Sequence, residues 1–132
     1  MQDRPTAAEL LATIEEYLTG EVLPNVSGTL RYHTLVAANM VRILEREAEQ
    51  YPGAVATERE ALCSLLGIEP VGRAEGQVAA LNAALADRLR NGSGPAFERD
   101  ALEVLLPATK AKLDINKPGY DSYDMAAEVN LP

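Results

Sequence analysis

Apolar residues along this chain recur mostly at spacings of three and four, which places them on one face of an α-helix. Gly and Pro residues separate the stretches that follow this spacing, and we find no convincing strand pattern. The pattern predicts helices over residues 6–20, 30–51, 57–67, 74–90 and 95–115, the last kinked or split at Pro107. We therefore expect an all-α fold, a compact bundle of about five helices over residues 1–119 with an irregular tail over residues 120–132.

The stretch from Leu30 to Tyr51 has the broadest apolar face of the five. At about 100° per residue, more than half of its circumference is apolar, with contributions from Leu30, Tyr32, Val36, Ala37, Met40, Val41, Ile43 and Leu44. A helix with such a face is expected to be surrounded by other helices, so we place it at the centre of the bundle. The pairs Arg42–Glu45 and Arg46–Glu49 are expected on its solvated side.

Start and stop signals set the expected helix ends. Residues 6–9 and 57–60 both read Thr-x-x-Glu, which is the capping box at a helix N-terminus. Gly20 and Gly67 are expected to end the helices before them, because glycine readily adopts the left-handed conformation. Pro52-Gly53 is expected to end the second helix.

Composition narrows the function classes. A length of 132 residues suits one domain. The net charge of −8 argues against binding to nucleic acid or to an anionic membrane, both of which need a basic surface. The N-terminus has no apolar signal segment, and no apolar run approaches the roughly 20 residues of a membrane span. We therefore expect an acidic, cytoplasmic protein.

Catalytic and metal-binding patterns are missing from the sequence. The only histidine is His33, and Leu30 stands three residues before it, so the Glu-x-x-His pattern of di-iron bundles is absent. The only cysteine, Cys63, lies on an apolar stretch and is interpreted as a buried, inert thiol. The sequence also lacks a Gly-x-Ser-x-Gly motif and a phosphate-binding loop. We predict no catalytic residue, cofactor or metal.

Polar residues on the second helix are the main candidates for a binding site. His33 and Glu47 fall on its apolar face, and Asn39 borders that face. One interpretation is structural, since buried polar groups are hydrogen-bonded and can fix helix register. The other is a small-molecule pocket around His33, with the imidazole as its switchable group.

The tail contains a candidate interface. Tyr120, Tyr123 and Met125 give it apolar and aromatic character, which is typical of segments that pack against a protein surface. We expect the tail to pack on the bundle or on a partner. The acidic residues of the tail are interpreted as a solvated cluster rather than a metal site.

Four segments together resemble a known bacterial family of small proteins, domain of unknown function 6285. They are residues 2–11 (QDRPTAAELL), 33–39 (HTLVAAN), 44–47 (LERE) and 109–118 (TKAKLDINKP). The resemblance spans about residues 2–120 and implies gene neighbours that encode phosphotransferase-like kinases and acyl-CoA dehydrogenases. It implies no activity, but it singles out Arg4, His33, Asn39, Glu45, Arg46, Glu47, Lys112 and Pro118.

Two functions follow from these patterns. The first is a non-catalytic accessory or interaction protein, either a homodimer or a partner of a kinase-like or acyl-CoA pathway enzyme. Missing catalytic patterns and the apolar tail favour it. The alternative is a small-molecule-binding module or an unrecognised enzyme with its pocket at His33.

Overall fold

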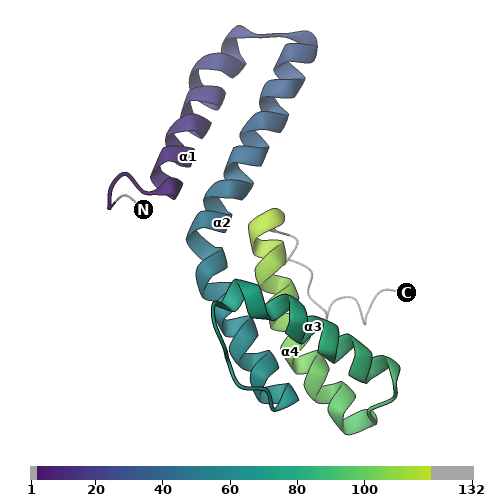
Figure 1. The fold of residues 1–132 in the computed structure, drawn as a ribbon. Coiled ribbons are helices and arrows are strands. Elements are labelled where there is room, and N and C mark those ends of the chain that lie inside the picture. Colours follow the sequence, from purple (N-terminus) through teal and green to yellow (C-terminus); the bar gives the residue numbers. More distant parts are fainter. Residues whose placement is uncertain (1–2, 120–132) are drawn as a thin grey trace, which may run out of the picture. The chain divides into compact units, whose positions relative to one another are not determined.

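The structure is a computed structural model that describes residues 3–119, and the described part is helical, without a strand (Figure 1). Its four α-helices are α1 (Ala7–Tyr17), α2 (Gly28–Leu66), α3 (Ala74–Arg90) and α4 (Pro95–Asn116). A π-helical turn, η1 (Leu18–Val22), and a 3-10 turn, η2 (Leu23–Asn25), follow α1. The all-α prediction is confirmed, but the described residues form four α-helices instead of the five that were expected.

Helix α2 explains the difference in helix number. It runs through Pro52 without a break, so the second and third predicted helices are one 39-residue helix. Proline keeps a helical φ and costs a helix one hydrogen bond. The carbonyl freed by Pro52 belongs to Ala48, which is exposed, so water can satisfy it. The capping box expected at Thr57 does not form, because its hydroxyl donates to the Gly53 carbonyl at 3.0 Å within the continuous helix.

The chain divides into two compact units, one within Met1–Tyr51 and one within Pro52–Pro132. Helix α2 contributes its first part to the first unit and its last part to the second. The expected single bundle domain over residues 1–119, with a tail over 120–132, stays a prediction.

The first unit is a helical hairpin, in which α1 and the first part of α2 run antiparallel (Figure 1). Helix α1 begins with the predicted capping box, since Thr6 Oγ1 accepts from the Glu9 amide at 3.2 Å and Glu9 Oε2 accepts from the Thr6 amide at 2.7 Å. Gly20 does not end the helix. It lies inside η1 and has no positive φ, so the chain stays helical up to Asn25.

The second unit holds most of the buried apolar side chains. The end of α2 packs with α3 and α4 around Val55, Leu62, Cys63, Val78, Leu81, Leu85, Ala101 and Ile115. Cys63 is 6% exposed and free, as the sequence predicted. Helices α3 and α4 begin and end within one residue of their predicted bounds, and α4 continues through Pro107.

The connection from α2 to α3 is held by local hydrogen bonds. Gly67 ends α2 with φ +67°, and the Ile68 amide donates to the Cys63 carbonyl at 3.1 Å, which confirms the predicted glycine cap. The Gln77 side chain then accepts from the Val71 amide and donates to the Glu69 carbonyl. These bonds anchor the loop to the first turn of α3.

Candidate functional site

The polar residues of the second predicted helix do not lie where a central, surrounded helix would put them. His33, Asn39 and Glu47 are all exposed, and so are the apolar residues Val36, Met40 and Leu44. The His33 ring lies tilted by 54° against the Tyr32 ring, with 5.8 Å between ring centroids. The groove between α2 and α4 in the second unit is lined by other residues. A ligand pocket around His33 stays a prediction.

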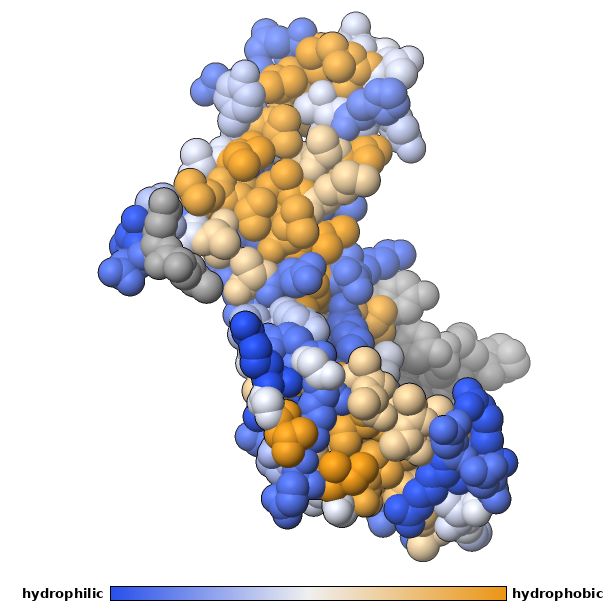
Figure 2. Space-filling view, viewed as in Figure 1, coloured by the Kyte–Doolittle hydropathy of each residue, from blue (hydrophilic) through white to orange (hydrophobic). Residues whose placement is uncertain are grey.

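A broad apolar surface covers one side of the first unit (Figure 2). Each of its members is between 48% and 59% exposed, and they come from both helices of the hairpin. We call this surface the hairpin face and define it by Leu10, Ile14 and Tyr17 of α1 and Leu30, Met40 and Leu44 of α2. Water-exposed side chains of this size and number are unusual on a monomeric protein.

Helix geometry places the two rows of the hairpin face on the same side. Leu10, Ile14 and Tyr17 follow helical spacing on α1, and the α2 row does the same. On each helix, take the direction that faces the other helix as the reference. Viewed along the chain direction of each helix, the apolar row of α1 and the apolar row of α2 are both turned away from this reference in the same rotational sense. In an antiparallel pair, rows rotated in the same sense face the same side. The hairpin therefore presents one continuous apolar surface.

The seam between α1 and α2 is thin. Among the described residues of the first unit, only Thr34 and Ala38 are buried, at 6% and 1% exposure. Thr34 donates its hydroxyl to the Leu30 carbonyl at 2.8 Å. At the seam, Arg42 of α2 forms an ion pair with Glu15 of α1, rather than the predicted pair with Glu45. Small side chains let the helices approach closely, but they bury little apolar area.

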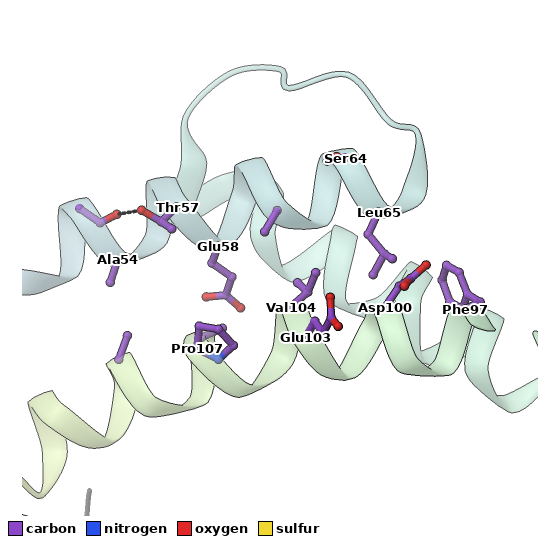
Figure 3. A pocket seen from close by; sticks show the side chains of 14 residues that line it. Ala54, Thr57, Glu58, Ser64, Leu65, Phe97, Asp100, Glu103, Val104 and Pro107 are labelled. Atoms are coloured by element: carbon purple, nitrogen blue, oxygen red, sulfur yellow. Dashed lines mark hydrogen bonds between the residues drawn. The ribbon is translucent and has the colours of Figure 1, made fainter. Parts of the chain in front are cut away.

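A groove of about 800 Å³ lies in the second unit between α2 and α4 (Figure 3). Small residues, including Gly53, Ala61 and Ala108, leave the space open along its walls. At the α4 side, Asp100 and Glu103 point into it (Figure 3). The groove combines an apolar lining with negative charge.

Glu58 lines this groove and connects all three helices of the second unit. It is 7% exposed, and its Oε1 accepts from Lys112 Nζ of α4 at 2.9 Å and from Asn82 Nδ2 of α3 at 3.0 Å. The paired charge of Lys112 is what allows a carboxylate to stay buried here.

Sequence reasoning missed the Glu58 cluster. The sequence places Glu58 at a helix start, as the second residue of the Thr57–Glu60 capping box. Glutamate side chains are mostly exposed, so burial of Glu58 is not expected there. The available signal was Lys112, which belongs to the segment that resembles the family. Its partner lies 54 residues away in sequence, so no local pattern could identify it.

Two further features were sought in the part of the chain that the structure describes, a metal-binding cluster and a membrane-spanning helix. Residues 3–119 contain no group of three His, Cys, Asp or Glu side chains placed to hold a metal ion. Among the described helices, none is both long and apolar enough to cross a bilayer. The predicted interface residues Tyr120, Tyr123 and Met125 lie outside the described residues.

Comparison with known proteins gives one match. The model of a family described as a domain of unknown function, DUF6285, matches residues 24–120. The matched range includes three of the four segments on which the resemblance rested and begins after the first of them. Searches of curated proteins and of solved structures found no match.

Proposed function

The chain belongs to the DUF6285 family, whose function is unknown, and from its geometry we propose that it is a non-catalytic interaction protein that binds a protein partner through the hairpin face. The single observation that carries this proposal is the exposure of six large apolar side chains on one side of a two-helix unit. Contiguous apolar surface of this kind is typical of protein–protein contacts.

The thin seam supports the same proposal. A hairpin that buries only Thr34 and Ala38 gains little free energy from its own packing. Small helical units of this kind commonly gain their missing core by association. A partner that covers the hairpin face would supply that core.

The expectation of a kinase-like or acyl-CoA pathway enzyme as partner belongs to this proposal. It rests on the resemblance alone, because the hairpin face carries no feature specific to either enzyme class. The partner's identity is therefore a result of the experiment rather than a premise of it.

Photo-crosslinking in the host cell tests the proposal. A photoreactive phenylalanine analogue replaces Leu44 on the hairpin face, and a matched control variant carries it at Leu35. The two positions are nine residues apart, about two and a half turns, so they lie on opposite sides of α2. Both leucines are similarly exposed, at 50% and 43%.

We expect light-dependent adducts at position 44 and none at position 35. The adduct mass then identifies the partner as another protein or as a second copy of the chain. An absence of adducts at both positions, with the tagged protein present at normal levels, would remove the support for this function. Equal adducts at both positions would mean that contact is not specific to the hairpin face.

A small-molecule-binding role is the second candidate, and the groove between α2 and α4 favours it. Asp100 and Glu103 give the groove negative charge beside an apolar lining. A fitting ligand is a small organic cation with a slim apolar body. Its binding would use the groove rather than the surface around His33.

Calorimetric titration with alkylammonium compounds tests this second candidate, with alkyl carboxylates of equal chain length as controls. We expect the ammonium compounds alone to bind, and Ala61→Phe, which fills the groove, to abolish their binding. Equal binding of both series would exclude charge recognition. No binding of either series would exclude the role for this ligand class.

A further inference from the structure

From the hairpin face we infer that its partner is a second copy of this chain, packed face to face about a two-fold axis that crosses α2 near Met40. The inference rests on the proposed function, and it names both the occupant and the register. The product is an antiparallel four-helix bundle made of two hairpins. In it, α2 of one protomer lies beside α2 of its partner.

The area of the hairpin face fits a stable dimer. Its six side chains are about half exposed, which leaves roughly 500 Å² of apolar surface if a fully exposed side chain of this size presents about 160 Å². A standard interface covers about 800 Å² on each partner, of which roughly 60% is apolar. The hairpin face therefore has the apolar area that one side of such an interface needs.

The register comes from a seven-residue spacing on α2. His33, Met40 and Glu47 are seven residues apart, so they form one row along the helix. A two-fold axis at Met40 inverts this row, and it places His33 opposite Glu47 of the partner subunit. The same inversion places Val36 opposite Leu44 of the partner subunit, because each lies four residues from Met40.

Charge complementarity selects this arrangement. In the inverted row, each His33 imidazole faces a Glu47 carboxylate, Met40 faces its own copy, and Val36 faces Leu44. A parallel arrangement of the two α2 helices would instead bring Glu47 close to the partner subunit's Glu47, which is unfavourable. Polar residues in such a row commonly fix register and orientation. The inference thus accounts for the two polar residues within the apolar surface.

Sedimentation velocity of the full chain over a range of concentrations is the first test. We expect a reversible monomer–dimer equilibrium. Leu44→Asp should weaken dimerisation at least about a hundredfold, because it buries a charge in the interface. Leu35→Asp, on the opposite side of α2, should leave the equilibrium unchanged. A monomer at every concentration would overturn the inference.

Disulfide trapping tests the position of the axis. In a Cys63→Ala background, Met40→Cys should form a covalent dimer on mild oxidation, because a residue on a two-fold axis lies next to its own copy. Glu49→Cys, exposed on another side of the same helix, is the control. A dimer that traps at position 49 and not at position 40 would overturn the proposed axis.

Charge exchange tests the register. His33→Glu should weaken the dimer at least about tenfold, because it places two carboxylates opposite each other. Adding Glu47→Lys should restore the affinity to within about threefold of the original, since each glutamate then faces a lysine. If the double variant loses as much dimer affinity as the two single variants lose together, the register is contradicted.

The proposed function and this inference fail in different ways. A monomeric protein whose position 44 still crosslinks to another protein in the cell retains the proposed function and loses the second copy as partner. A monomeric protein without any adduct loses both. A dimer that fails the charge exchange keeps its partner and loses the register.

Discussion

At the scale of single residues, the Glu58 carboxylate joins the three helices of the second unit. Its Oε1 accepts one hydrogen bond from α3 and one from α4, so three helices meet at one oxygen. Lys112 supplies the positive charge from a side chain that is 54% exposed, while the Glu58 side chain is 6% exposed. Removing Lys112 leaves the carboxylate buried with Asn82 as its remaining partner.

Lys112→Met should therefore destabilise the second unit by about 1–2 kcal/mol. The value lies toward the lower end of hydrogen bonds to charged groups because solvent screens the exposed lysine. Urea unfolding followed by circular dichroism measures the change. As a control, Arg90→Met removes an exposed pair with Asp87 and should cost less than about 0.5 kcal/mol. Equal losses in the two variants would show that Glu58 gains nothing from its charged partner.

At the scale of secondary-structure elements, Pro52 and Pro95 have opposite effects on their helices. Pro52 lies inside α2, where it removes a hydrogen bond. Pro95 is the first residue of α4, where the amide would have no helical partner. The same residue type is thus unfavourable in one helix and suited to the other.

Pro52→Ala should raise the thermal midpoint of unfolding, and Pro95→Ala should leave it unchanged or lower it slightly. The first change restores a helical amide, and an interior proline costs a helix about 3 kcal/mol relative to alanine. Differential scanning calorimetry of the two variants measures both shifts. A lower midpoint for Pro52→Ala would mean that the restriction of the unfolded chain by proline outweighs the lost hydrogen bond.

The sequence predicts the start of α1, the end of α2 and both ends of α3 and α4 well, because these boundaries depend on local signals. The Thr6 capping box and the Gly67 cap are examples, since each acts within a few residues. Whether the helix continues through Pro52 depends on tertiary packing, which no local signal shows. The burial of Val55 and Leu62 after Pro52 stabilises the continuous helix despite the lost hydrogen bond. The exposure of His33 could not be predicted either, because a broad apolar face does not reveal whether its own chain covers it.

At the scale of the whole molecule, the two units differ in how they are stabilised. Of the nine buried apolar residues in the described chain, only Ala38 belongs to the first unit. The second unit has a core of its own. The first unit buries little of its own, so under our proposal its stability depends on the partner that covers the hairpin face.

Dilution should therefore destabilise the first unit alone. For a dimer, each tenfold dilution shifts the equilibrium by about 1.4 kcal/mol. Hydrogen exchange read by mass spectrometry should show faster exchange of residues 30–47 in dilute protein. Exchange at residues 78–85 of α3 should stay constant, and an equal acceleration of both segments would contradict the separate stabilisation of the units.

The thin seam between α1 and α2 also decides which sequence changes this hairpin can accept. Thr34 and Ala38 are buried at the seam, so selection there should act on size and permit little beyond threonine, serine, alanine or glycine. On the opposite rows of the same helix, selection should act on polarity and allow leucine, isoleucine and methionine to replace one another. Among relatives of this chain, positions of α2 at the seam should therefore vary little in side-chain size, while positions of α2 on the hairpin face should vary in shape but stay apolar.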